Sequence, residues 1–281
     1  SGPRASHAAR ATSPLSTPPE KATSTRPRAR MESTRAPYVR ARSTCDVAAH
    51  MRRAKASPEI KACAIPNGEG GPRHPGAVRP DHLECTACGK HHEVRLRNLC
   101  DCGGPLFARY ALANVRKEDL RPRRDLWRYA PLLPVDKSRI RSRGEGGTPL
   151  LRLERIGSGG RVARLKVREL YVKDEGRNPT GTFKARGMAV AIPMAESLGA
   201  ETVIAPTAGN AGVALALYAS AYGLGATILM TPDAPSDAMR GAVDCGARVA
   251  QVDGDITQAG RLAQDLAMAT GAFNVATLRE P

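Results

Sequence analysis

Aromatic residues are scarce in this chain of 281 residues: they make up 4% of it, with one tryptophan and three phenylalanines. The hydrophobic fraction of 41% still permits a core, which must therefore be mainly aliphatic. No apolar run approaches the roughly 20 residues of a transmembrane helix, so we expect no membrane-spanning segment. At about 100–200 residues per domain, the length allows about two domains.

Acidic residues are also few, and they are fewest near the N-terminus. Residues 1–80 hold 15 Lys or Arg but only 5 Asp or Glu, a net charge of +10, together with 11 of the 22 prolines. This composition predicts a disordered basic tail over residues 1–80. The first methionine is Met31, and the segment has no apolar core of a secretory signal. An organellar transit peptide and an upstream extension or gene-boundary artefact both remain open, and both rank above an arm that binds nucleic acid.

Four of the seven cysteines share a regular spacing, C-x₂-C-x₁₁-C-x-C, with glycine after the second and the fourth. They are Cys85, Cys88, Cys100 and Cys102. Two such knuckles can place four thiolates around a structural zinc ion, and without a secretory signal a disulfide framework is less favoured. We therefore predict a zinc ribbon over residues 81–110; a ribbon that has lost its metal is the alternative. Cys45, Cys63 and Cys245 have no partner spacing.

Within this ribbon, residues 92–96 alternate as a short hairpin strand would. Four sulfur ligands complete a zinc site, so we expect His91 and His92 to be solvated. Residues 111–144 then form a linker, in which the single tryptophan, Trp127, is expected to pack in the core.

Strand-like and helix-like segments alternate from residue 202 onward. Predicted strands cover 202–206, 226–231, 247–252 and 272–276, and predicted helices cover 211–222, 236–245 and 255–270. Expected helix C-caps are Gly223, Gly225, Gly246 and Gly271. Repeated βα units indicate the α/β class, with a parallel sheet covered by helices. Ligands of such sheets bind at the carboxyl ends of the strands.

Two loops carry the candidate chemistry. The first, residues 173–187, contains the turn 178–181 and then Lys184, which we place on the first turn of a helix continuing through 188–198. A helix N-terminus disfavours a cation and lowers a lysine pKa, as a Schiff-base lysine requires. The second loop, 207–212, is rich in small residues between a strand and a helix, which leaves backbone N–H groups free for an anion such as a carboxylate.

Together these loops resemble the pyridoxal-phosphate enzymes of fold type II, and within them the threonine synthase family. The resemblance covers roughly residues 83–281 and includes an N-terminal zinc ribbon. It rests on four ordered motifs: Glu-Gly-Gly-Thr-Pro-Leu at 145–150, Pro-Thr-Gly-Thr-Phe-Lys at 179–184, Pro-Thr-Ala-Gly-Asn-Ala at 206–211 and Thr-Leu-Arg-Glu-Pro at 277–281. It implies a catalytic domain over 145–281, with a small parallel-sheet subdomain at about 200–276.

The resemblance also implies roles for individual residues. Lys184 would attach pyridoxal phosphate and serve as acid and base, Phe183 would pack near the cofactor ring, and Asn210 would hydrogen-bond its 3-hydroxyl. The substrate α-carboxylate would be bound by Thr207, Ala208, Gly209 and Ala211. Arg186 would either orient the loop or meet a substrate phosphate, with a solvated helix charge as the plain alternative.

The reaction implied is the conversion of O-phosphohomoserine and water into threonine and phosphate. A cytoplasmic enzyme with a small-molecule substrate follows, with a homodimer as the candidate assembly, organellar import through the tail as an alternative location, and neither membrane nor nucleic acid as an expected partner. Two other classes stay open. One is another fold type II enzyme, such as a serine/threonine dehydratase or a cysteate synthase; the other is a non-catalytic zinc-ribbon protein that binds nucleic acid.

Two departures from the family pattern bear on this interpretation. Ala185 stands where many relatives have aspartate, which weakens the substrate assignment slightly. The sequence stops at Pro281, before the Gly-rich loop that cradles the cofactor phosphate in the family. Ser158-Gly159-Gly160 is better interpreted as a hairpin turn than as that loop. We therefore expect an incomplete chain whose own activity is low or absent.

Overall fold

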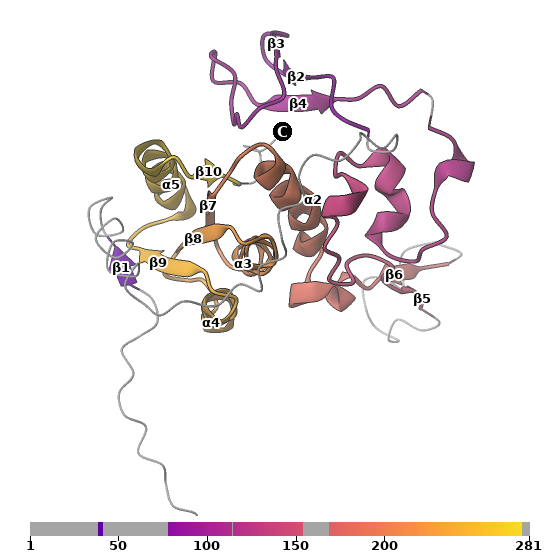
Figure 1. Ribbon diagram of the computed structural model, residues 1–281. Coiled ribbons are helices and arrows are strands. Elements are labelled where there is room, and N and C mark those ends of the chain that lie inside the picture. Colours follow the sequence, from indigo (N-terminus) through magenta and orange to yellow (C-terminus); the bar gives the residue numbers. More distant parts are fainter. Residues whose placement is uncertain (1–38, 42–77, 114, 154–168, 277–281) are drawn as a thin grey trace, which may run out of the picture. The chain divides into compact units, whose positions relative to one another are not determined.

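The structure is a computed structural model that describes residues 39–41, 78–113, 115–153 and 169–276 (Figure 1). Most of the basic segment 1–80 lies outside these residues, as do the turn expected at 158–160 and the motif at 277–281. The division into tail, ribbon, linker and catalytic domain therefore stays a prediction. Across the described ranges, no helix combines the length and the apolar character needed to cross a membrane.

A five-stranded sheet in the order β1-β9-β8-β7-β10, parallel throughout, confirms the predicted α/β class. Its strands are β1 (Val39–Ala41), β7 (Thr202–Thr207), β8 (Gly225–Met230), β9 (Arg248–Val252) and β10 (Phe273–Asn274). Strands β7, β8 and β9 lie within one residue of their predicted bounds. Strand β10 is shorter than predicted, and β1 comes from the basic segment, where no strand was expected.

Helices follow the strands closely and also match the predicted pattern. They are α2 (Lys184–Ser197), α3 (Asn210–Tyr222), α4 (Ser236–Asp244) and α5 (Ile256–Thr270). Gly223 and Gly271 adopt the left-handed conformation at C-caps, as predicted, and Gly246 follows the cap of α4 with a positive φ. The assignment of Gly225 was wrong, because this residue already pairs with Thr202 as the first residue of β8.

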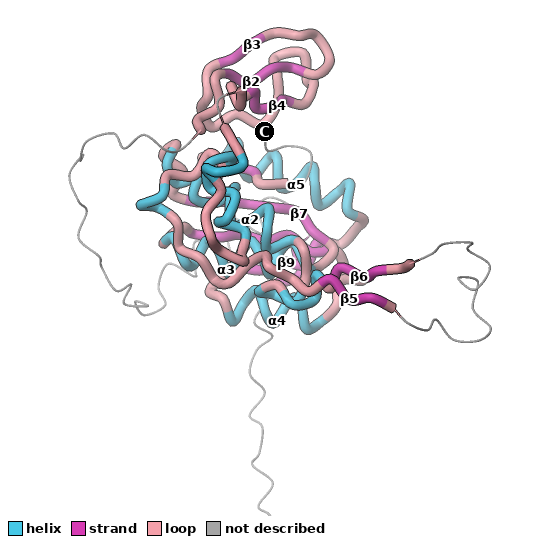
Figure 2. Tube along the Cα trace, turned by 90° about the vertical axis from the view of Figure 1, so that its right-hand side faces the viewer, coloured by secondary structure: helices cyan, strands magenta, loops and turns pink. Residues whose placement is uncertain are grey.

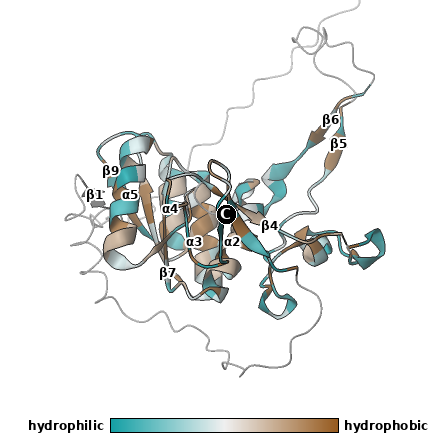
Figure 3. Cartoon of the chain, turned by 90° about the horizontal axis from the view of Figure 1, so that it is seen from above, coloured by the Kyte–Doolittle hydropathy of each residue, from teal (hydrophilic) through white to brown (hydrophobic). Residues whose placement is uncertain are grey.

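Each face of the sheet is covered by helices because successive strand residues point to opposite faces. On β7, Val203 and Ala205 join a large apolar cluster with α2, α3 and α4, whereas Ile204 joins a second cluster with α5. Strand β8 divides in the same way, with Ile228 in the first cluster and Leu229 in the second. Figure 3 shows the hydrophobic colouring concentrated in the strands between these helices.

Two smaller antiparallel sheets precede this domain. The first, in the order β3-β2-β4, consists of β2 (His82–Cys85), β3 (His91–His92) and β4 (Leu106–Arg109). The predicted strand at 92–96 was wrong beyond His92, because residues 93–96 turn away from β2 instead of pairing with it. The second sheet pairs β5 (Leu150–Arg152) with β6 (Tyr171–Lys173), which run side by side in Figure 2.

Short 3₁₀ turns connect these parts. They lie at η1 (Lys117–Asp119), η2 (Leu126–Leu132), η3 (Lys137–Arg139), η5 (Glu175–Arg177) and η6 (Pro179–Gly181). The first strand after the Glu145–Leu150 motif is β5, as the sequence predicts. Trp127 in η2 is 1% exposed, which confirms that it packs in the core.

Helix α3 lies so close to the sheet that only glycine fits at position 212. A Cβ atom there would lie 2.8 Å from the side chains of Ile228 and Thr207 and 2.9 Å from that of Met230. Gly260 in α5 offers a matched comparison, because a Cβ atom there would meet nothing within 4 Å.

We expect Gly212→Ala to destabilise the fold by about 1–3 kcal/mol through overpacking. Gly260→Ala should stabilise it by about 0.5–1 kcal/mol, since alanine has the higher helix propensity. Chemical denaturation of both variants measures the difference. Equal stabilisation by the two substitutions would contradict the close contact between α3 and the sheet.

Candidate functional site

The loop after β7 lies at a reversal of strand order in the parallel sheet. From β7 the chain passes through α3 to β8 on one side, whereas β10, reached last, lies on the other side of β7. Connections that leave such a strand pair diverge, and the opening at the carboxyl ends of the strands is the usual ligand site of open α/β sheets. Residues 207–210 occupy this position.

The N-terminus of α3 in this loop is built to receive an anion. Its N-cap, Gly209, has a φ of 151°, a conformation that favours glycine, and no side chain caps the helix. The N–H of Gly209 donates to the Oγ1 atom of Thr207 at 3.1 Å, which fixes that hydroxyl in the loop. Since uncapped N–H groups and the helix dipole both favour negative charge, the loop can hold a carboxylate or a phosphate.

Lys184 is the first residue of α2, as predicted, and its side chain is half-buried. Its Nζ atom lies 5.0 Å from the centroid of the Phe183 ring, whose residue is 58% exposed. Helix α2 packs against α3, and η6 also contacts α3. The helix that carries the amine and the helix that carries the anion loop therefore form one packed unit.

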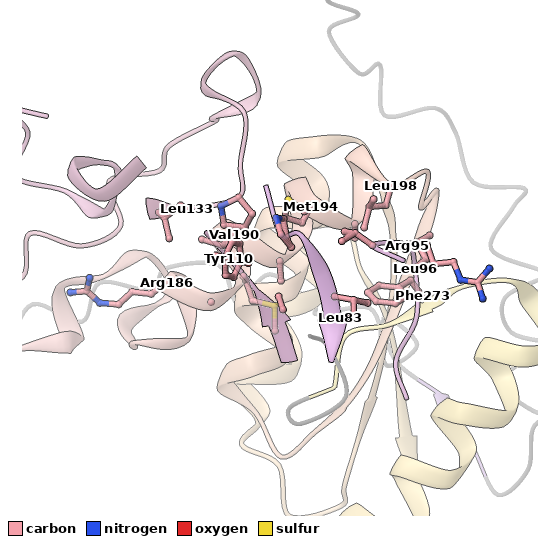
Figure 4. Close-up of a pocket in the computed structure, with 18 of the residues that line it drawn as sticks. Leu83, Arg95, Leu96, Tyr110, Leu133, Arg186, Val190, Met194, Leu198 and Phe273 are labelled. Atoms are coloured by element: carbon pink, nitrogen blue, oxygen red, sulfur yellow. The ribbon is translucent and has the colours of Figure 1, made fainter. Parts of the chain in front are cut away.

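Lys184 and Phe183 also line an apolar cavity of about 560 Å³ (Figure 4). Aliphatic side chains of α2, including Val190 and Met194, form one wall of it, and Leu83 of β2 lies at another. Residues 207–211 are not among its lining residues. The cavity thus adjoins the lysine without including the anion loop.

Arg186, one of the predicted site residues, forms a two-point ion pair with Glu175. Its Nε and Nη2 atoms lie 2.7 and 2.9 Å from the two carboxylate oxygens, and Nη2 also donates to Thr148 at 3.1 Å. The guanidinium of Arg186, together with bonds from Thr148 and Asn178, lowers the pKa of Glu175 to about 2. The pair ties the start of α2 to the 145–150 motif.

Asn178 extends this network. Its Oδ1 atom accepts the N–H of Gly146 at 2.9 Å, and its Nδ2 atom donates to Glu175 Oε2 at 2.8 Å. The next turn contains Thr180 at a φ of 66°, which is rare for a β-branched residue. This strained conformation lies in the segment leading to Lys184, as backbone strain near functional sites often does.

The 145–150 motif is held on its other side by the backbone of residues 124–126. A Cβ atom at Gly147 would lie 2.1 Å from the carbonyl oxygen of Arg124, so this approach requires glycine. Glu145 is fully buried and accepts hydrogen bonds from Trp127 Nε1, from the Tyr218 hydroxyl at 2.8 Å and from the N–H of Arg143 at 2.8 Å. These bonds compensate a carboxylate removed from water.

Sequence analysis did not identify Glu175, Asn178 or Glu145 as residues that shape the site. The available signal was position alone, because Glu145 belongs to the 145–150 motif and the other two immediately precede the lysine segment. The structure brings Arg186 to this network. No described contact joins Lys184 directly to Asn210.

The four predicted zinc-ligand cysteines come together, with all their sulfur atoms within 4.8 Å of one another. Individual Sγ–Sγ distances are 3.5 Å for Cys85–Cys102, 3.7 Å for Cys88–Cys100 and 3.5 Å for Cys88–Cys102. Four sulfurs at 2.3 Å from a tetrahedral zinc would lie about 3.8 Å apart. Backbone N–H groups of Cys88 and Ala87 lower the pKa of the Cys85 thiol to about 6, which favours a thiolate. The donor set fits a structural zinc ion.

His92 corrects one expectation about this cluster: it is not solvated but 9% exposed. Its Nδ1 atom lies 2.9 Å from Nη1 of Arg97, and its Nε2 atom lies 3.2 Å from Sγ of Cys100. Because a guanidinium only donates, Nδ1 accepts and the Nε2–H donates to the sulfur. His92 thus orients a predicted ligand and offsets thiolate charge. His91 is exposed, as expected.

Comparison with known proteins agrees with this arrangement. The family model for pyridoxal-phosphate-dependent enzymes matches residues 141–281. Threonine synthase of Methanocaldococcus jannaschii is 38% identical over 191 residues, which cover 65% of this chain and 46% of that protein. The 2-amino-4-ketopentanoate thiolase beta subunit of Acetoanaerobium sticklandii is 45% identical over 85 residues, 30% of this chain and 18% of that subunit.

Among solved structures, that of an O-ureido-L-serine synthase is similar at 28% identity and a TM-score of 0.38, covering 45% of this chain and 40% of that one. The chain spans less than half the length of these curated relatives.

The Glu175–Arg186 pair gives a pH-dependent prediction. Since the pKa of Glu175 is lowered from 4.5 to about 2, its contribution to stability is present above pH 4.5 and is lost as the pH falls toward 2. Glu175→Gln should cost about 1–3 kcal/mol at neutral pH, and the difference from the unchanged protein should shrink on acidification.

Urea denaturation at several pH values measures this difference. Glu169→Gln is the control, because the Glu169–Arg152 pair is solvent-exposed and should contribute less than about 1 kcal/mol. A cost for Glu175→Gln that does not change between neutral and acidic pH would rule out the charge-based role.

Proposed function

This chain belongs to the family of pyridoxal-phosphate-dependent enzymes, and we propose that the protein is a threonine synthase, which converts O-phosphohomoserine and water into threonine and phosphate. The observation that carries the proposal is the packing of two helices, one starting at Lys184 and the other at the anion loop. The names of several relatives, among them the Methanocaldococcus enzyme, support the substrate.

The residues present fit pyridoxal phosphate. A half-buried amine begins α2 beside an exposed aromatic ring, and an uncapped helix N-terminus stands at the carboxyl edge of the sheet. We propose that Lys184 attaches the cofactor, that Phe183 packs near its ring and that Asn210 hydrogen-bonds its 3-hydroxyl. Within the described ranges we assign no residue to the cofactor's phosphate.

When bound, the cofactor supplies an electron sink that allows protons to leave the α and β carbons of an amino acid. The chain's own groups would do the rest. The amine of Lys184 would move protons at these carbons, while the hydroxyl of Thr207 and the N–H groups of Ala208, Gly209 and Ala211 would bind the substrate carboxylate.

We assign Arg186 a positioning role instead of a contact with substrate phosphate. Its guanidinium already makes two bonds to Glu175 and one to Thr148, which leaves little donor capacity for a ligand. Through these bonds it would hold the lysine segment against the 145–150 motif.

The purified protein should release inorganic phosphate from O-phosphohomoserine with formation of threonine. Lys184→Ala should lower the rate by at least about 10²–10⁴-fold, the usual contribution of a positioned proton-transfer group. Lys137→Ala, at an exposed lysine of η3, is the matched control and should leave the rate unchanged. A colorimetric phosphate assay together with amino-acid analysis measures both.

Two further outcomes separate the cofactor from the substrate. Borohydride reduction in the presence of pyridoxal phosphate should label Lys184, which peptide mapping identifies; label spread over several lysines would contradict the assigned role. If Lys184 is labelled but serine or threonine yields ammonia and no phosphate is released from O-phosphohomoserine, the protein is another member of the family.

We also propose that the four-cysteine cluster binds one structural zinc ion. Elemental analysis after dialysis against a chelator should find one zinc per chain. Cys88→Ser should lose it and lower the stability of the ribbon, whereas Cys245→Ser, at a half-buried cysteine outside the cluster, should retain it. Zinc retained in Cys88→Ser would contradict the four-sulfur site.

A further inference from the structure

We infer that the ribbon carries a second metal site, formed by His82, Glu84 and His91 on the face of β2 opposite the cysteine cluster. It would take a divalent transition ion such as Zn²⁺, Co²⁺ or Ni²⁺. The inference does not depend on the proposed reaction.

Strand geometry separates the two faces. On β2, Leu83 and Cys85 are buried toward the cysteine cluster, whereas the alternating residues His82 and Glu84 lie on the other face. Glu84 pairs directly with His91 of β3. The consecutive residues His91 and His92 are therefore divided by the pleat: His92 serves the cysteine cluster, and His91 joins His82 and Glu84.

The three side chains converge. Their potential ligand atoms all lie within 4.8 Å of one another. The imidazole rings of His82 and His91 are stacked, with centroids 3.9 Å apart and planes inclined by 25°. Small rotations of the two rings would direct one nitrogen of each toward a shared ion.

An unpaired polar atom supports a missing ligand. The Nε2 atom of His82 is buried, and no described residue lies within hydrogen-bond distance of it. Buried polar groups without a partner are uncommon in folded proteins and call for an explanation. A metal ion would provide one for this nitrogen.

Arg109 is the one described cation that is bonded to this group. Its Nε atom donates to Oε2 of Glu84 at 2.5 Å, which neutralises part of the carboxylate charge. The other oxygen, Oε1, stays available as a ligand, and the Arg109 side chain is 49% exposed and free to turn into solvent.

The donor set selects the class of ion. Two imidazoles and one carboxylate suit zinc, cobalt or nickel, whereas magnesium and calcium require a shell of oxygen atoms. Three protein ligands leave at least one position for water, so we expect this ion to exchange more readily than the one held by four thiolates.

Cobalt distinguishes the two sites by colour, because thiolate ligands give strong near-ultraviolet charge-transfer bands and imidazole with carboxylate does not. Titration of the metal-free, reduced protein with Co²⁺ should show two equivalents, the tighter one with thiolate bands and the weaker one without. His91→Gln and Glu84→Gln should lose the weaker equivalent and keep the thiolate bands, which also report that the ribbon is folded.

Controls exclude general binding to surface groups. Glu93→Gln changes an exposed carboxylate next to the hairpin, and His50→Gln changes a histidine outside the described residues; both variants should keep two equivalents. A single equivalent in the unchanged protein would overturn the inference. So would a weaker equivalent that survives in the His82→Gln/His91→Gln double variant, or one that magnesium displaces as readily as zinc does.

Discussion

The contact between α3 and strands β7 and β8 is the constraint on which the rest of the site depends. With glycine at 212, the helix lies directly on Ile228, Thr207 and Met230. This approach fixes where the helix begins, and therefore where its N–H groups open at the edge of the sheet. Helix α2, which carries Lys184, is positioned in turn by packing on α3. A packing requirement in the core thus sets the placement of two groups that are far apart in sequence.

Much of the sheet and its helices could be predicted because both signals are local. Short aliphatic runs bounded by glycine defined β7, β8 and β9 within one residue, since a strand buried on both faces is a continuous apolar run. The errors arose where tertiary pairing decides. Residues 93–96 alternate like a strand, yet only His91 and His92 find partners on β2. Gly225 resembles a helix cap, but it already pairs in the sheet.

The candidate site was predictable in part for a similar reason. Lys184 and the loop at 207–210 could be located from motif spacing, which places each beside a helix start. The network of Glu175, Asn178 and Arg186 could not, because a charged residue in a polar loop looks the same in sequence whether it is solvated or paired across eleven residues. His92 was misjudged likewise: counting four sulfurs gave no indication that a ligand also needs a hydrogen-bond donor to hold it.

The scarcity of aromatic residues has a spectroscopic consequence. Trp127 is the only tryptophan of the chain, and its indole N–H is bonded to the buried carboxylate of Glu145. Its fluorescence therefore comes from a single place, next to the glycines that support the lysine segment. Any movement of that support, or entry of water beside the carboxylate, would shift the emission of one defined chromophore, so the chain contains its own optical reporter of this region.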